Sequence, residues 1–185
     1  MNGSKREATF ADLEAIAPNR VGEIVAGELY ESPRPAPLQA RAASRLGMLL
    51  GRSFDLGKEG PGGWVIIHKP ELHLGSDALV PDLAGWRRER MPEMPHTAAF
   101  TLAPDWVCEV LSPSTAVLDR EKKMKAYGRE GVSHLWLLDP LQHSLEVYRL
   151  ENRRWSPRGL WSGGATVHAE PFTVLSLKLA TLWER

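Results

Sequence analysis

The middle of the chain constrains the fold most, because a strand, a helix and a second strand are predicted there in succession. Residues Asp105–Leu111 form an apolar run typical of a strand. Apolar spacing predicts a helix from about Leu118 to Glu130, and Gly131 is placed to close it. Strand character resumes at His134–Leu138. This alternation predicts a mixed α/β or α+β architecture.

The remaining segments add short elements on both sides of this unit. We expect a helix opened by the capping pattern Thr9–Asp12, a hairpin over Val21–Glu31 that turns at Ala26-Gly27, and a helix from about Pro37 to Leu50 stopped by Gly51. Further strands are predicted at Trp64–Ile67, Glu71–Leu74, Leu79–Leu83 and Ser144–Leu150, with a loop over Arg87–Ala103 and two or three short strands in the tail.

Length and composition are those of an ordinary globular domain. The 185 residues suit a single domain, 1–185, and the 43% hydrophobic and 25% charged residues exclude a disordered or fibrous chain. No apolar run is long enough to span a bilayer, so we expect no membrane association. Cys108 is the only cysteine, which excludes an internal disulfide and suits a cytoplasmic location.

Charge gives no general attraction to nucleic acid, because 23 basic and 23 acidic residues cancel. Basic stretches occur at Arg87–Arg90, Arg120–Lys125 and Arg149–Arg158, but runs of this size are more often solvated faces. A nuclease can still be neutral, since metal-binding carboxylates offset the lysines and arginines that hold phosphates.

Two carboxylates lie inside apolar, strand-like runs. Asp82 follows Pro81, and Glu109 comes 27 residues later on the same strand face as Val107 and Leu111. A buried ionised carboxylate is costly unless a cation, hydrogen bonds or a metal compensates. Magnesium suits such hard oxygen ligands. The alternative is structural, with Asp82 capping a turn and Glu109 paired to a lysine.

A second feature is the set of Asp119, Lys123 and Tyr127, whose i, i+4, i+8 spacing places them on one helix face. An exposed Asp-Lys pair would contribute only about 0.3–0.5 kcal/mol. If the helix covers the sheet where Glu109 ends, however, the Lys123 ammonium lies beside the carboxylates, where it could orient a water or stabilise a pentavalent phosphate.

Other chemistry-bearing residues are assigned to structure. Cys108 points away from Glu109 and is expected to be a buried, inert thiol. The six histidines, including His68 and His73, have no zinc-ligand spacing. The sequence also holds no phosphate-cradling glycine loop, dinucleotide fingerprint or nucleophile elbow.

Taken in order, these motifs resemble the Uma family of restriction-endonuclease-like proteins. The resemblance extends from about Phe10 to Leu182, and the family is similar in turn to the PD-(D/E)XK nuclease superfamily. It implies a restriction-endonuclease-like mixed central β-sheet flanked by helices. The residues that carry it are Glu23-x-x-x-Gly27-Glu28, Pro81-Asp82, Pro104-Asp105-Trp106-Val107-Cys108-Glu109-Val110-Leu111-Ser112-Pro113-Ser114-Thr115, Asp119-x-x-x-Lys123-x-x-x-Tyr127, Gly131-Val132, Trp136 and Asp139-Pro140.

The resemblance also implies roles by position. Asp82 and Glu109 would be metal ligands, with the Val110 carbonyl as a backbone ligand. The superfamily lysine is expected two residues after the second acid, where this chain has Leu111, so Lys123 looks like its migrated substitute. The implied catalytic set is therefore Asp82, Glu109 and Lys123, and the supporting residues are Asp119, Ser112 and Tyr127.

The chain departs from the family pattern at two places. Leu38-Gln39 stands where a histidine is usual near the start of the second helix, and His134-Leu135 replaces the usual Glu-Tyr before Trp136. These departures argue against assuming the usual substrate handling. The intact set of Asp82, Glu109 and Lys123 argues for an active enzyme.

The leading hypothesis is a metal-dependent nuclease that uses Mg²⁺ or Mn²⁺ to hydrolyse phosphodiester bonds, as a DNA endonuclease acting as a homodimer. DNA or RNA, and endonucleolytic or exonucleolytic cutting, stay open. One alternative is a catalytically silent module on the same fold that binds nucleic acid or a protein partner. Another is an assembly protein whose seven tryptophans form a subunit interface.

Overall fold

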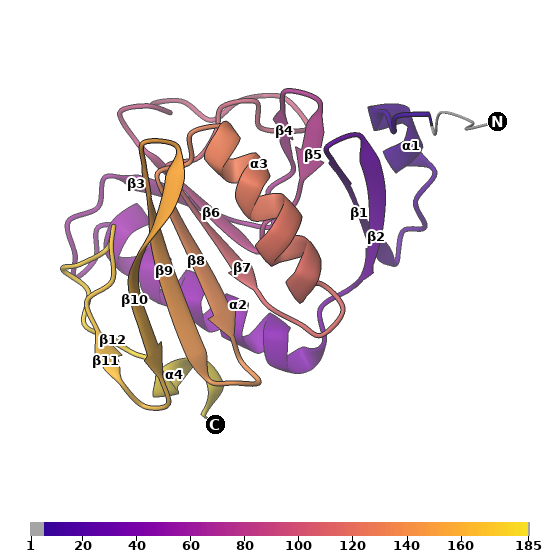
Figure 1. Cartoon of the computed structure of the whole chain (residues 1–185). Helices are drawn as coiled ribbons and strands as arrows, with labels where there is room; N and C mark the ends of the chain where they lie inside the picture. The colour runs from indigo at the N-terminus through magenta and orange to yellow at the C-terminus, as the bar shows by residue number, and fades with distance from the viewer. Residues whose placement is uncertain (1–5, 185) are drawn as a thin grey trace.

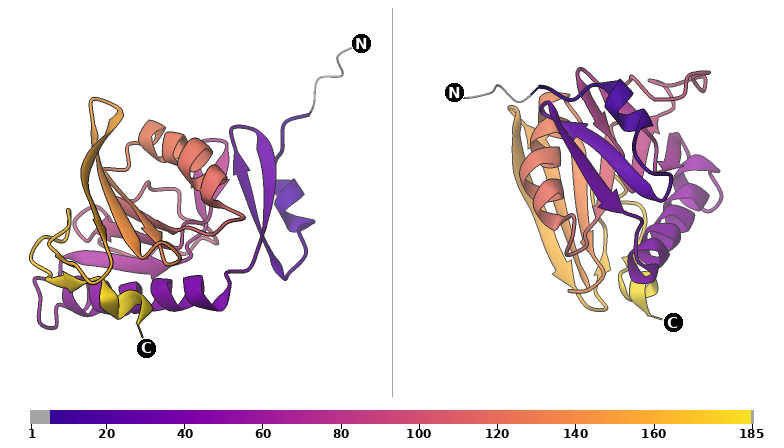
Figure 2. Two further views of the ribbon diagram at one scale, coloured as in Figure 1. Left: turned by 60° about the horizontal axis from the view of Figure 1, so that its bottom comes forward. Right: turned by 90° about the vertical axis from the view of Figure 1, so that its right-hand side faces the viewer.

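A six-stranded mixed sheet organises the fold in the computed structural model, which describes residues 6–184. Helices cover both faces of this sheet, as Figures 1 and 2 show. Only β7 and β8 run parallel, and the other neighbours are antiparallel. The strand order is β10 (Arg154–Ser162), β9 (Ser144–Glu151), β8 (His134–Asp139), β7 (Trp106–Val110), β6 (Leu83–Arg87) and β3 (Trp64–His68).

A smaller four-stranded sheet stands beside the first, at the right of Figure 1. Its hairpin turns at Ala26 and Gly27, which have positive φ values of 51° and 77°, as a tight two-residue turn requires. The predicted hairpin is therefore confirmed. The strand order is β2 (Glu28–Pro33), β1 (Arg20–Val25), β5 (Asp77–Leu79) and β4 (Leu72–Leu74).

The two faces of the six-stranded sheet support separate cores. Trp106, Cys108 and Val110 of β7 pack with α2 (Pro37–Leu50), whereas Val107 and the following Leu111 pack with α3 (Met124–Arg129). The predicted alternation along β7 is thus confirmed, and it turns Glu109 towards the α3 side. The remaining elements are α1 (Phe10–Glu14), β11 (Thr166–Val167), β12 (Leu177–Lys178) and α4 (Ala180–Trp183).

The α-helical part of the second helix has the predicted bounds, but Gly51 does not end the helical segment as predicted. Gly51 has a right-handed φ of −59°, and a π-helical turn, η1 (Gly51–Asp55), continues from α2. This continuation buries Phe54, whose ring lies 4.6 Å from that of Phe172. Burial of this aromatic ring favours extension over a left-handed cap.

The strand predicted over Leu79–Leu83 is wrong, because two strands of different sheets meet there. β5 ends at Leu79 in the small sheet, and β6 begins at Leu83 in the large one. Pro81 lacks an N–H group to donate to a ladder, which favours a break at this point. Asp82 consequently lies on the link between the two sheets rather than inside a strand.

Two further predictions need correction in detail. The helix predicted over Leu118–Glu130 begins as a π-helical segment, η2 (Leu118–Lys123), before α3, although Gly131 closes it with a φ of 77° as expected. The tail holds a nine-residue strand, β10, besides short ones. Within residues 6–184, no helix combines the length and apolarity that a membrane crossing demands.

We predict that truncation of Leu46 will destabilise the fold, because its side chain is fully buried between α2 and the sheet. Leu46→Ala should lower the free energy of unfolding by about 2–5 kcal/mol in urea titrations. Met48 lies on the same helix but is 65% exposed, so Met48→Ala should change it by less than about 0.5 kcal/mol. Equal losses in the two variants would contradict this packing.

Candidate active site

A cavity of about 380 Å³ opens where the two sheets meet the start of α2 and the η2 segment. The β1–β2 hairpin, the β5–β6 link and the carboxyl end of β7 form its other walls. Its lining residues with groups suited to binding or catalysis include Glu23, Gln39, Lys69, Asp82, Glu109, Asp119 and Lys123. The three residues predicted to be catalytic therefore share one cavity.

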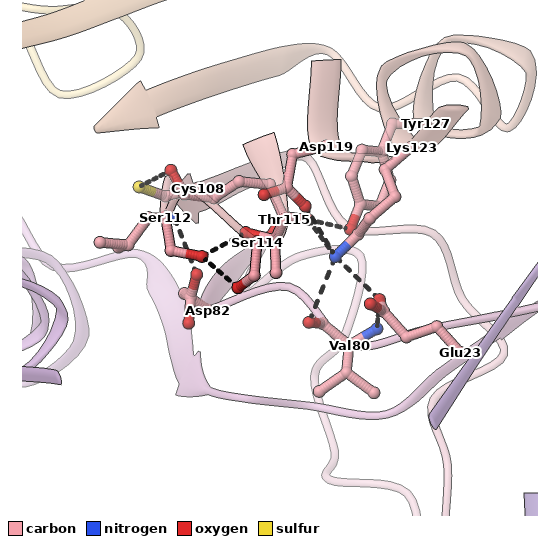
Figure 3. Close-up of polar contacts among 12 residues, drawn as sticks. Glu23, Val80, Asp82, Cys108, Ser112, Ser114, Thr115, Asp119, Lys123 and Tyr127 are labelled. Atoms are coloured by element: carbon pink, nitrogen blue, oxygen red, sulfur yellow. Dashed lines mark hydrogen bonds and ion pairs between the residues drawn. The ribbon is translucent and has the colours of Figure 1, made fainter. Parts of the chain in front are cut away.

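The ammonium group of Lys123 is the centre of this site, and its side chain is only 2% exposed. Its Nζ atom lies 2.8 Å from Glu23 Oε1 and 2.8 Å from Glu109 Oε1. Asp119 Oδ1 is 3.5 Å away, as is the Val80 carbonyl oxygen (Figure 3). A single cation thus connects three acidic side chains from β1, β7 and η2.

These contacts keep Lys123 charged despite its burial. Burial alone would lower the pKa of the ammonium, but Glu109 and Glu23 outweigh that effect and raise it well above its ordinary value. Removing one partner of such a buried pair typically costs about 3–5 kcal/mol, because the other charge is left uncompensated. The carboxylates around Lys123 are therefore required for its position.

Burial acts on the acids in the opposite sense. It raises the pKa of Glu109 well above the ordinary value, and Lys123 offsets only part of this rise. Burial likewise raises the pKa of Asp119. Tyr127 donates a hydrogen bond of 2.6 Å to Glu109 Oε1, and the pKa of this tyrosine is raised well above its usual range, chiefly by burial.

Asp82 is held by a different lysine. Its Oδ1 atom is 2.7 Å from the Nζ atom of Lys69, and its Oδ2 atom accepts a 2.7 Å hydrogen bond from the backbone N–H of Val110. Lys69 also donates its own N–H to the Asp82 carbonyl at 3.0 Å. Lys69 has a φ of 48°, a left-handed conformation that non-glycine residues adopt at some cost.

The hydroxyl groups after β7 line the same cavity. Ser112 Oγ lies 3.0 Å from Ser114 Oγ and 3.0 Å from Thr115 Oγ1. Thr115 in turn hydrogen-bonds to Asp119, which lowers the pKa of Asp119 and so opposes the effect of its burial. The predicted supporting residues Ser112, Asp119 and Tyr127 therefore all lie in or beside the site.

Sequence reasoning missed three residues of this cavity. Glu23 is 4% exposed, pairs with Lys123 and accepts a 2.7 Å hydrogen bond from the Val80 N–H. The motif that contains Glu23 contributed to the family resemblance, but no role was predicted for this residue. Gln39 is 5% exposed on the inner face of α2. A polar residue among apolar ones signalled both positions. No sequence pattern signalled Lys69, which lies in a turn distant along the chain from Asp82.

Cys108 and the histidines take no part in this constellation. Cys108 is buried on the opposite face of β7, and burial raises the pKa of its thiol well above the usual value, as expected of an inert cysteine. The Nε2 atom of His73 lies 2.7 Å from Glu71. Neither His73 nor His68 lines the cavity.

The donor set fits a hydrated hard cation rather than zinc. Four carboxylates, two lysines and Arg34 line the cavity, which leaves a formal charge of −1 when all are ionised. Over residues 6–184, no three histidine, cysteine or acidic side chains are grouped as ligands for one ion. Mg²⁺ binds through one or two carboxylates and retains several waters, so Asp82 and Glu109 with the Val110 carbonyl provide suitable oxygens.

Comparisons with known proteins give a family from one match and a fold from another. The Uma2 family model, described as "Putative restriction endonuclease", matches residues 8–181. A solved structure, described as a "putative nuclease belonging to DUF820" from Anabaena variabilis, has a TM-score of 0.77 at 20% sequence identity. The match covers 95% of this chain and 97% of that one, and at this identity it shows a shared fold and nothing further. No curated protein sequence matches the chain.

We predict that Glu109→Gln will change how the stability of the metal-free protein depends on pH. Because the folded pKa of Glu109 lies well above its ordinary value of 4.5, the folded state retains a proton that the unfolded chain has lost. Stability therefore falls as pH rises from about 4.5 towards the folded pKa. Glutamine cannot ionise, so the stability of the variant should fall less than that of the wild type between pH 5 and pH 8, whatever the constant cost of losing the charge opposite Lys123.

Urea unfolding in EDTA at several pH values measures this difference. Glu89 is exposed, so Glu89→Gln is the matched control and should follow the wild-type profile. Parallel profiles for the wild type and Glu109→Gln would contradict a raised pKa at Glu109.

Proposed function

The chain belongs to the Uma2 family of putative restriction endonucleases, and from this premise we propose that it is a metal-dependent nuclease that hydrolyses phosphodiester bonds in DNA. The observation that carries the proposal is the buried Lys123 ammonium. It lies between Glu23 and Glu109 in a cavity that Asp82 also lines. A purely structural ion pair would not require a second carboxylate-lysine pair, Asp82 with Lys69, in the same cavity.

Asp82, Glu109 and the Val110 carbonyl are the groups proposed to hold Mg²⁺ or Mn²⁺. A bound divalent cation supplies Lewis acidity, which lowers the pKa of a water and neutralises charge on the phosphate. The Val110 N–H fixes Asp82 through its 2.7 Å hydrogen bond. Tyr127 fixes Glu109 in the same way, so both acids are oriented before a ligand arrives.

Lys123 is proposed to stabilise the negative charge of the pentavalent phosphate. Its raised pKa keeps the ammonium protonated at neutral pH, so it provides positive charge rather than acting as a base. Asp119 and Glu23 hold it in place, and Asp119 is four residues earlier on the same helical segment. Because the ammonium is already oriented, little reorganisation is needed when charge develops on the phosphate.

Lys69 is proposed to neutralise Asp82 when no metal is bound. Its side chain is 29% exposed at the cavity, so it can leave Asp82 and contact a substrate phosphate instead. Arg34 lines the same cavity and adds a third cation beside Lys69 and Lys123. The proposed substrate is therefore an extended polyanion whose backbone crosses this opening. Homodimerisation, which would present two such openings to one duplex, is part of the same proposal.

We predict that purified protein with Mg²⁺ or Mn²⁺ cleaves supercoiled or single-stranded DNA, and that Asp82→Asn and Lys123→Met reduce the rate at least 100-fold. Loss of a preorganised charge at the reacting phosphate typically has an effect of this size. Gel assays measure the rates, and circular dichroism confirms that each variant is folded. Lys125 is exposed two residues further along, in α3, so Lys125→Met is the matched control and should keep full activity.

Equal cleavage by the wild type, Asp82→Asn and Lys123→Met would refute this site. Failure of the wild type to cleave any nucleic acid, together with DNA binding that depends on salt but not on metal, would instead identify a silent nucleic-acid-binding module.

We also predict that Lys69→Met binds Mg²⁺ roughly fivefold more tightly than the wild type, because the ammonium no longer competes for Asp82. Fivefold corresponds to about 1 kcal/mol, the upper range for a partly exposed ion pair. Titration calorimetry without nucleic acid measures the affinity, and Lys58→Met is the exposed control. Unchanged affinity in Lys69→Met would show that Asp82 does not hold the cation.

A further inference from the structure

Gln39 is a polar residue on the buried face of α2, where the other residues are apolar. The inner face of α2 consists of Gln39, Ala42, Ala43, Leu46 and Leu50, all buried. The Gln39 side chain is only 5% exposed, and it lines the cavity that contains Asp82, Glu109 and Lys123. Among these helix residues, Gln39 alone brings a polar group to the cavity wall.

The side-chain oxygen of Gln39 is buried and has no hydrogen-bond partner among residues 6–184. An amide oxygen can only accept hydrogen bonds or contact a cation. A buried acceptor without a donor costs free energy, so native structures rarely keep one without a reason. The cost here is unexplained by packing alone, since leucine of similar size would fill the same space.

The cavity cannot supply the missing donor from its own charged groups. None of its charged groups donates a hydrogen bond to the Gln39 oxygen. Its two lysines already pair with carboxylates, and Arg34 donates to the Pro18 carbonyl. The hydroxyls of Ser112, Ser114 and Thr115 hydrogen-bond within their own loop or to Asp119. The donor must therefore come from outside the described chain.

We propose that the Gln39 side-chain oxygen accepts a hydrogen bond from the hydration shell of the divalent cation held at Asp82 and Glu109. The inference rests on the proposed function and assigns Gln39 as a positioning residue for that cation. Mg²⁺ keeps several waters when it binds a protein, and these polarised waters are strong donors. Such outer partners typically alter metal affinity by about 10–100-fold. A nucleic-acid base could also donate to Gln39, but it would not affect metal binding by the protein alone.

The test compares Gln39→Leu with the wild type by titration calorimetry with MgCl₂ and by thermal unfolding in EDTA, both without nucleic acid. Leucine keeps the volume but removes the acceptor. We expect Gln39→Leu to bind Mg²⁺ at least tenfold more weakly. In EDTA it should unfold about 2–4 °C higher, because the unsatisfied oxygen is gone. Gln39→Glu, which restores an acceptor, should bind Mg²⁺ at least as tightly as the wild type.

Gln142 is the only other glutamine and is exposed in the β8–β9 turn, so Gln142→Leu is the matched control and should change neither measurement.

Wild-type Mg²⁺ affinity in Gln39→Leu would overturn the proposal. A lower unfolding temperature of Gln39→Leu in EDTA would also overturn it, because the amide would then have a structural partner. Absence of Mg²⁺ binding by the wild type would overturn both this inference and the metal in the proposed function. If Gln39→Leu binds Mg²⁺ more weakly but the wild type cleaves no nucleic acid, the inference is supported and the nuclease activity is refuted.

Discussion

The arrangement of the two sheets depends on one buried ammonium group. Lys123 reaches from the η2 segment to Glu23 in the small sheet and to Glu109 in the large one, and both contacts measure 2.8 Å. Either acid in its ionised form would be costly there without a cation, and the cation would be costly without them. The same contacts that join the sheets therefore concentrate charge at their junction, which is where the cavity opens.

A junction of this kind explains why irregular backbone gathers around the cavity. Asp82 lies on the link between strands of different sheets, and Lys69 adopts a left-handed conformation beside it. Lys123 belongs to a π-helical segment, an element often found at functional sites. Each irregularity has a local cost, and the surrounding strands hold it in place. A regular strand at Asp82 would pair that backbone within one sheet instead of carrying the chain between two.

The regular elements could be predicted from the sequence because their patterns are local. The bounds of the second helix, the turn at Ala26-Gly27 and the alternation along β7 follow from spacing within a few residues. The helical continuation past Gly51 could not be predicted, because it is stabilised by the contact between Phe54 and Phe172, which are far apart in sequence. The strand predicted across Pro81 is wrong because an apolar run does not reveal that its two ends belong to different sheets.

The same distinction applies to the site. Asp82, Glu109 and Lys123 could be proposed because each lies in a recognisable motif, whereas Glu23, Lys69 and Gln39 join them only through the tertiary fold. Of these, Gln39 differs in kind, since Glu23 and Lys69 each have an opposite charge to satisfy them and the Gln39 oxygen has no donor. A fold selected for stability alone would place an apolar residue there. The retained amide is therefore better explained by a ligand that enters the cavity than by the packing of α2 against the sheet.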